Sequence, residues 1–185
     1  MANFVGETKV QTALHERELT LVKIKHPHEF TGIDNEALLG SGSFGTVYCA
    51  KENDGRLRAV KIIPAQRWVD DEGATQRQVM AEVNSWVQLE ESPYIVKYCN
   101  AWGWPEKGNY LYISMQFCSG GNLHSKLSTN PTTKQITHWL LQLSRGVEWM
   151  HEKHIVHRDL YTQNVFIDSD NNIRIGDFGL ARSLK

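Results

Sequence analysis

The sequence predicts an α+β fold in which a strand-rich half precedes a helix-rich half. Residues 38–63 read LLGSGSFGTVYCAKENDGRLRAVKII, where runs rich in β-branched and aromatic residues alternate with glycine-rich breaks, as in a meander of three antiparallel strands. Residues 132–153 carry apolar side chains at three- and four-residue steps, which is typical of a long amphipathic helix. The apolar stripe of this helix comprises Ile136, Leu140, Leu143, Val147 and Met150.

The other elements complete a five-stranded sheet with one helix, followed by a helical region. Residues 74–91 are expected to form the helix of the first half. Residues 94–102 and 110–118 read as two further strands joined by a short turn that contains proline and glycine. Short strands are expected at residues 164–168 and 173–178, on either side of a DSDNN turn. The apolar face of the first helix comprises Val79, Val83, Trp86 and Leu89.

Composition indicates an ordinary globular chain and excludes several classes of protein. The 185 residues include 41% hydrophobic and 22% charged residues, and the formal net charge of −1 gives no signal for nucleic-acid binding. Three widely spaced cysteines suggest neither a disulfide framework nor a zinc site, which fits a reducing compartment. No apolar run has the length of a signal-peptide core or a membrane span. We therefore expect a cytoplasmic protein, with the nucleus as the alternative, and no membrane partner.

Gly40, Gly42 and Gly45 form a G-x-G-x-x-G frame that three kinds of phosphate-binding fold use in similar forms. A dinucleotide-binding turn should open a helix after the third glycine, but TVYCA reads as a strand. A P-loop needs a lysine where Thr46 stands. Two alternatives stay open from this motif alone: a hairpin that covers nucleotide phosphates and a glycine-rich hairpin without a ligand.

Lys61 lies inside the apolar strand AVKII, where an unpaired ammonium would be costly to bury. It could lie on the exposed face of an edge strand. It could instead bind a phosphate while a carboxylate steers it, and Glu82 in the following helix is the natural candidate. Taken alone, this lysine favours neither interpretation.

The segment HRDLYTQN decides between these alternatives. Asp159 lies two residues after His157, and Asn164 follows five residues after the aspartate. The tripeptide Asp177-Phe178-Gly179 comes next. Together with the glycine frame, the A-V-K strand and the helix glutamate, these motifs occur in the order found in protein kinases, which the chain resembles over residues 30–185.

The resemblance implies a bilobal protein-kinase-like fold and a domain organisation. It implies an N-terminal extension over residues 1–28, an N-lobe with five antiparallel strands, the helix αC and the hinge over 29–118, and a partial helical C-lobe over 119–185. An activation loop, an A-P-E segment and further helices would be expected after residue 185, so the domain is expected to be incomplete as given.

The resemblance also implies ATP and Mg²⁺ as cofactors and assigns roles to single residues. Lys61, paired with Glu82, would hold the α- and β-phosphates, and Asp159 would accept or orient the substrate hydroxyl proton. Asn164 and Asp177 would bind Mg²⁺ through oxygen atoms. The residues expected around the nucleotide are Leu39, Gly40, Gly42, Gly45, Val47, Ala59, Lys61, Met115 as the gatekeeper, Gln116, Phe117 and Cys118 in the hinge, and Phe166.

Finer features look most similar to the kinases of the translation initiation factor 2 alpha subunit, with Wee-type and NIMA-related kinases as alternatives. The segments that carry this likeness are IVKYCNAW, LYISMQFC and NIRIGDFGLARSLK. The expected function is transfer of the ATP γ-phosphate to a serine or threonine hydroxyl of a protein, the initiation factor subunit being one candidate substrate. A dimer is one option for the oligomeric state.

One position departs from the family pattern. Tyr161 stands two residues after Asp159, where serine/threonine kinases generally have a lysine that contacts the γ-phosphate. A phenol donates one hydrogen bond but brings no positive charge. The alternative function is therefore a truncated or inactive kinase-like module that binds a nucleotide or a partner without catalysis.

Overall fold

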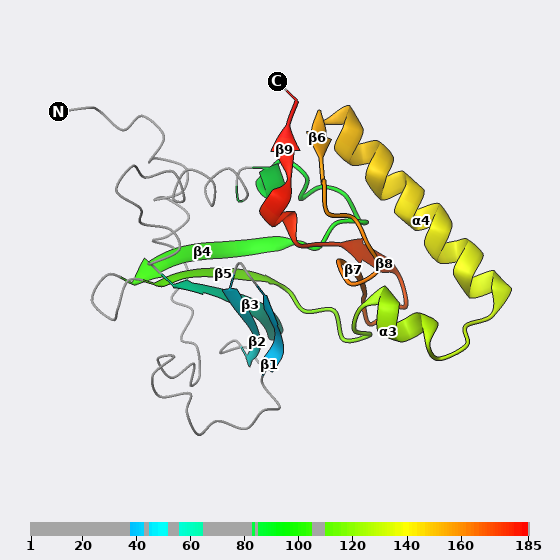
Figure 1. The fold of residues 1–185 in the computed structure, drawn as a ribbon, viewed down its shortest axis with the longest axis horizontal. Helices are drawn as coiled ribbons and strands as arrows, with labels where there is room; N and C mark the ends of the chain where they lie inside the picture. Colours follow the sequence, from blue (N-terminus) through cyan, green and yellow to red (C-terminus); the bar gives the residue numbers. More distant parts are fainter. Residues whose placement is uncertain are drawn as a thin grey trace. The chain divides into compact units, whose positions relative to one another are not determined.

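The computed structural model describes residues 38–42, 45–51, 56–64, 83, 85–104 and 110–184 (Figure 1), and for residues 100, 102–104, 110 and 111 it describes the backbone alone. Contacts divide the described residues into two compact units. The first contains the residues up to 64 together with those from 99 to 116. The second contains the residues from 83 to 98 and those from 117 onward. The domain boundary expected after residue 118 stays a prediction.

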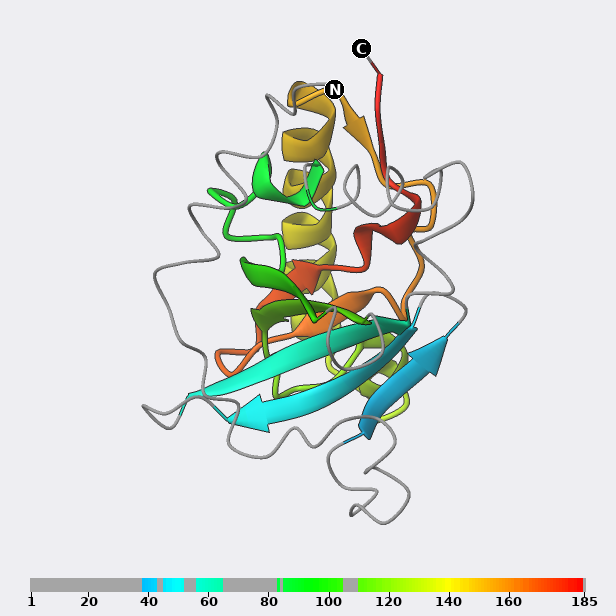
Figure 2. The same cartoon turned by 90° about the vertical axis from the view of Figure 1, so that its left-hand side faces the viewer.

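The first unit is built on a five-stranded sheet, as the sequence predicts. Its strands are β1 (Leu38–Gly42), β2 (Gly45–Lys51), β3 (Leu57–Pro64), β4 (Tyr98–Trp104) and β5 (Tyr110–Gln116), in the spatial order β1-β2-β3-β5-β4. The pairs β1–β2, β2–β3 and β3–β5 are antiparallel. Figure 2 shows β1, β2 and β3 side by side, so the glycine frame lies in a hairpin and not at a strand-to-helix turn.

The register of these strands gives the sheet two chemically different faces. Val60 pairs with Tyr48 on one side and with Ser114 on the other, and Ile62 pairs with Tyr112. Side chains alternate between faces along a strand. The face that carries Val60 and Ile62 therefore forms an apolar cluster with Tyr112, Ala50 and the half-buried Tyr48.

In the described part of the chain, the second unit includes the helices α3 and α4 and two small sheets. Its elements are α3 (Leu123–Leu127), α4 (Thr133–Glu152), β6 (Ile155–Val156), β7 (Val165–Ile167), β8 (Ile173–Ile175), the 3₁₀ turn η5 (Phe178–Leu180) and β9 (Arg182–Ser183). Strand β7 pairs with β8, and β6 pairs with β9, both antiparallel. The predicted strands around the DSDNN turn are thus confirmed as the β7–β8 hairpin. Within the described residues, no helix has the length and apolar character needed to cross a membrane.

Helix α4 begins where a capping box fixes its first turn. The Thr132 hydroxyl accepts a hydrogen bond from Gln135 N at 3.3 Å, and Gln135 Oε1 accepts one from Thr132 N at 2.9 Å. The helix lies where the sequence predicts it, and Met150 is the one member of the apolar stripe that it buries. Leu140 is 59% exposed. The buried residues of α4 are Trp139, Gln142, Gly146 and Met150.

Polar contacts explain why α4 buries this other face. Trp139 Nε1 donates to Asn171 O at 3.0 Å, and Gln142 Nε2 donates to Asn172 Oδ1 at 2.7 Å. Gln142 Oε1 also accepts from Ile173 N at 2.9 Å. A buried glutamine with both ends of its amide bonded costs little, yet a pattern of apolar residues does not predict it.

Residues 94–97 correct the predicted strand at 94–102, because β4 begins only at Tyr98. Ile95 instead forms a parallel bridge with Ile175 of β8. Val96 N donates to Ile175 O at 2.8 Å, and Ile175 N donates to Tyr94 O at 2.7 Å. The backbone groups of this segment are therefore satisfied by the β7–β8 hairpin of the second unit and not by β5.

Replacement of Gly45 by alanine is predicted to destabilise the first unit by roughly 1–3 kcal/mol. Gly45 has φ +135°, and an added Cβ would lie 2.4 Å from Ile62 O. Gly42→Ala is the matched control, because an added Cβ at Gly42 meets nothing within 4 Å. Urea unfolding followed by circular dichroism measures both variants, and equal stabilities would contradict the conformational role given to Gly45.

Candidate active site

The open end of the β7–β8 hairpin brings Asn164 and Asp177 together. Val165 pairs with Ile175 in the ladder, and Gly176 N donates to Asn164 O at 2.9 Å. Asn164 therefore lies opposite Gly176, directly before Asp177. These two residues are thirteen positions apart in the sequence, and the hairpin register is what makes them neighbours.

Asn164 also holds Asp159 in place. Asn164 Nδ2 donates to Asp159 O and to Asp159 Oδ2, both at 2.9 Å. Asn164 N donates to Tyr161 O at 3.0 Å, which closes the turn between the two residues. Asn164 is buried, at 5% exposure. Because its amide nitrogen is committed to Asp159, its Oδ1 is the atom left to accept a donor or bind a cation.

His157 connects this turn to the hairpin and has a defined tautomer. Its ring is buried, and Nε2 lies 2.9 Å from Gly176 O. A carbonyl oxygen can only accept, so Nε2 carries the proton and donates. Nδ1 of the neutral ring then accepts from Asp159 N at 3.3 Å. The imidazole thus links the backbone of Asp159 to the backbone that leads into Asp177.

Aromatic packing anchors the residue after Asp177. Phe178 is fully buried, with its ring centroid 5.6 Å from that of Trp86 and 5.0 Å from that of His157. Trp86 also contacts Tyr98, with centroids 6.0 Å apart in an edge-to-face arrangement. Asp177 itself has φ 58°, a left-handed conformation that costs a non-glycine residue on the order of 1 kcal/mol. Burial of Phe178 offsets this cost.

The first unit gathers the predicted nucleotide-binding residues of its strands on one sheet face. Val47 pairs with Lys61, and Ala59 pairs with both Cys49 and Met115. Since side chains alternate, all five residues share the face opposite the apolar cluster. Lys61 is 6% exposed, so the strand lysine is buried and not on an exposed face.

Other predicted nucleotide-binding residues lie near the glycine frame and the end of β5. Leu39, Gly40 and Gly42 are exposed on β1, whereas Gly45 is half-buried at the start of β2. Gln116 is the half-buried last residue of β5. Glu82, the expected partner of Lys61, lies outside the described residues.

Cys118 and Phe166 belong to the second unit, where they have different environments. Cys118 is buried, and Phe166 is half-buried on β7. Burial raises the pKa of the Cys118 thiol to about 12; the Arg174 guanidinium opposes this shift and the Asp168 carboxylate adds to it. If Cys118 contacts a nucleotide, it must do so through its backbone, because its side chain points into the protein.

The sequence did not predict the ion pair that braces the hairpin. Arg174 Nη2 lies 2.9 Å from Asp168 Oδ2, and Arg174 Nη1 donates to Pro93 O. Asp168 Oδ1 accepts from the backbone N of Asp170 and of Asn172 at 3.0 and 2.9 Å. The position of Asp168 at the start of the DSDNN turn indicates that its side chain caps the turn, since aspartate commonly does so. No sequence pattern indicates that Asp168 pairs with Arg174.

Phe178→Ala is predicted to destabilise the second unit by about 3–5 kcal/mol, because it leaves a cavity against Trp86 and His157. Leu184→Ala is the control, since Leu184 is 69% exposed and such substitutions usually change stability by less than about 0.5 kcal/mol. Thermal unfolding monitored by tryptophan fluorescence measures both. A Phe178→Ala variant as stable as the control would exclude the aromatic anchor.

Cys118 is predicted to resist alkylation at pH 7–8, because a thiol with a pKa of about 12 carries almost no thiolate there. Cys99 is exposed and serves as the internal control. Iodoacetamide labelling followed by mass spectrometry of tryptic peptides gives both rates from one sample. Equal labelling of Cys118 and Cys99 in the folded chain would contradict the burial of Cys118.

Comparison with known proteins identifies the family. The family model described as protein kinase domain matches residues 33–185. Similar curated proteins include the serine/threonine-protein kinases Nek4 of Mus musculus, 37% identical over 80% of this chain, and Nek3 of Oryza sativa subsp. japonica, 34% identical over 79%. Nek1 of Mus musculus is 32% identical over 79%.

The chain spans only 19%, 25% and 12% of the length of these three relatives. Their names agree with the NIMA-related alternative of the sequence analysis, while the likeness to initiation factor kinases stays a prediction. With the five-stranded sheet and the turn that joins Asp159 to Asn164, the match over residues 33–185 shows that this chain belongs to the protein kinase domain family.

Proposed function

We propose that the chain is a serine/threonine protein kinase domain, which transfers the γ-phosphate of ATP to a hydroxyl group of a protein. The observation that carries this proposal is the pair of hydrogen bonds from the Asn164 amide to Asp159, at the hairpin end that leads into Asp177. The carboxylates of Asp159 and Asp177 and the amide oxygen of Asn164 suit phosphoryl transfer. In that reaction the negative charge of the phosphates must be neutralised and one proton must leave the substrate hydroxyl. The three relatives are all named serine/threonine-protein kinases, which supports serine or threonine as the residue that receives the phosphate.

In this proposal Asp159 acts on the substrate hydroxyl. Its Oδ2 accepts from Asn164, so the carboxylate cannot rotate freely, and its other oxygen is the one that would accept a hydroxyl hydrogen. Positioning of this kind contributes most of the rate in phosphoryl transfer, because the protein has little covalent chemistry to perform.

The donor set at the hairpin end fits the Mg²⁺ that the family implies. Asn164 Oδ1 and the Asp177 carboxylate would hold it, since both offer the hard oxygen atoms that this ion prefers. When bound, the ion would neutralise charge on the phosphates. Lys61, with Val47, Ala59 and Met115 on the same sheet face, would bind the nucleotide from the first unit.

Tyr161 favours a second candidate function, a kinase-like module that binds nucleotide or a partner with little catalysis. Its side chain is 49% exposed on the turn between Asp159 and Asn164. Loss of a charge-assisted hydrogen bond to the transferring phosphate would cost about 2–3 kcal/mol, or roughly 30- to 150-fold in rate. Nucleotide binding would survive this loss.

The compartment, the substrate and the assembly are proposed on narrower grounds. We propose a reducing compartment, cytoplasmic or nuclear, from the cysteine usage. We keep the alpha subunit of translation initiation factor 2 as a candidate substrate, on the motif resemblance alone, and a dimer as one candidate assembly. Phosphorylation of that subunit compared with casein in one assay would test the substrate.

Lys61→Met is predicted to lower MgATP affinity by at least about tenfold, because a buried charge-assisted contact to phosphate is lost while most side-chain volume is kept. Lys51→Met is the control, an exposed lysine on the neighbouring strand. Isothermal titration calorimetry measures both, after unfolding curves establish that each variant is folded. Unchanged affinity in a folded Lys61→Met variant would refute the assigned role.

Tyr161→Lys is predicted to raise the rate of phosphate transfer by roughly 30- to 150-fold, because it supplies a cation next to Asp159. Tyr161→Phe controls for loss of the hydroxyl and should not raise the rate. Transfer of radiolabelled γ-phosphate to casein measures both. An equal or lower rate for Tyr161→Lys would contradict this role for position 161 while leaving the nucleotide-binding proposal intact.

A further inference from the structure

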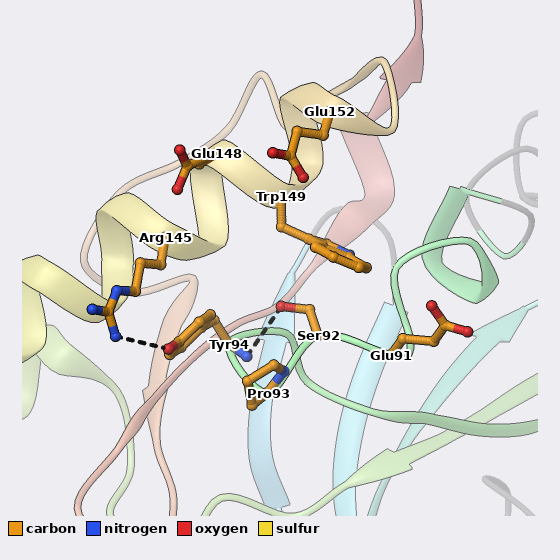
Figure 3. Close-up of a pocket in the computed structure, with 8 residues that line it drawn as sticks. All are labelled: Glu91, Ser92, Pro93, Tyr94, Arg145, Glu148, Trp149 and Glu152. Carbon is orange, nitrogen blue, oxygen red and sulfur yellow. Dashed lines mark hydrogen bonds between the residues drawn. The ribbon is translucent and has the colours of Figure 1, made fainter.

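A cavity of about 270 Å³ lies within the second unit, between α4 and the segment Glu91–Tyr94 (Figure 3). One wall consists of Arg145, Glu148, Trp149 and Glu152 of α4. These residues stand at positions i, i+3, i+4 and i+7 and so occupy one side of the helix. The cavity contains none of the residues named in the proposed function, so its ability to bind a ligand is independent of that function.

The walls of the cavity are fixed by contacts on both sides. Ile175 N donates to Tyr94 O, Arg174 donates to Pro93 O, and Arg145 Nη1 donates to the Tyr94 hydroxyl at 3.3 Å. Gly146 allows the helix to approach this segment, because an added Cβ would lie 2.8 Å from Ile175 Cδ1 and 3.0 Å from Tyr94 Cβ. The hollow is therefore preformed.

The charge of the cavity is unbalanced. Glu91, Glu148 and Glu152 line it, against the single guanidinium of Arg145. Arg145 points to the Tyr94 hydroxyl, as Figure 3 shows, and among the described residues none of the three glutamates forms an ion pair. The site has negative charge that a cation of a partner would neutralise.

Trp149 adds an aromatic wall that is suited to a cation. Lys153 Nζ lies 4.9 Å from the centroid of its ring, so this indole already interacts with one positive charge. Its Nε1 is buried and has no hydrogen-bond acceptor within the described part of the chain.

We propose that this cavity binds an arginine side chain of a protein partner. The volume lies at the lower end of the roughly 300–1,000 Å³ range of small-molecule pockets, which suits a ligand as small as one side chain. A guanidinium stacks on aromatic rings and donates a planar fork of hydrogen bonds to carboxylates, whereas an ammonium is a more strongly hydrated point charge. The combination of Trp149 with Glu148 and Glu152 therefore suits arginine better than lysine.

The test is a titration of the ¹⁵N-labelled chain with the tripeptide acetyl-Gly-Arg-Gly-amide, followed by NMR of the tryptophan indole N–H signals. The Trp149 signal is assigned from its loss in Trp149→Phe. We expect a saturable shift of that signal with the arginine peptide and a much smaller one with the neutral citrulline peptide. Absence of a shift with the arginine peptide would overturn the proposal. A shift of equal size with the citrulline peptide, with a peptide that has lysine in place of arginine, or with free spermidine would also overturn it.

Two double variants separate the cavity from bulk charge. Glu148→Gln with Glu152→Gln should weaken binding of the arginine peptide by at least about threefold, as expected for loss of partly exposed ion pairs. Glu90→Gln with Asp170→Asn removes the same charge from exposed acids outside the cavity and should leave affinity unchanged. Equal weakening by both pairs would overturn the site.

Discussion

The hydrogen bonds between the Asn164 amide and Asp159 are the constraint on which the candidate site depends. They fix a carboxylate to the start of β7, and the β7–β8 register then sets Gly176 opposite Asn164. The other features of the site in the second unit build on that point. His157 bonds to the Gly176 carbonyl, and Phe178 is held two residues later by packing against Trp86. A left-handed Asp177 is tolerated because both of its flanks are anchored in this way.

Local periodicity predicted most of the fold, because strands and amphipathic helices carry their signal within a few residues. The meander of β1 to β3, the long α4 and the β7–β8 hairpin are confirmed. One prediction was wrong where a distant contact overrides the local pattern. Residues 94–97 are apolar enough for a strand, yet they bond to β8. Helix α4 buries Gln142 because the backbone of Ile173 and the side chain of Asn172 satisfy its amide.

The site was predictable where motif spacing fixes a backbone geometry, and not where side chains meet across the fold. The interval from Asp159 to Asn164 is a closed turn, so the motif alone indicates their proximity. The packing of Trp86 on Phe178 joins residues that are 92 positions apart, and no pattern in either segment predicts this contact. The kinase family could be predicted because many motifs occur together in the expected order. The kinase subfamily could not, because it depends on short segments that several subfamilies share.

Both the catalytic and the nucleotide-binding proposals require that a metal-bound triphosphate lie at the open end of the β7–β8 hairpin. Titration of the ¹⁵N-labelled chain with ATP and a trace of Mn²⁺, whose unpaired electrons broaden nearby signals, tests this requirement directly. The backbone amide signals of Asn164, Gly176 and Phe178 should broaden first. Those of Asp170 and Asn171, at the turn that forms the other end of the same hairpin, should stay sharp. Equal broadening at both ends, or none near Asp177, would contradict the placement of the site.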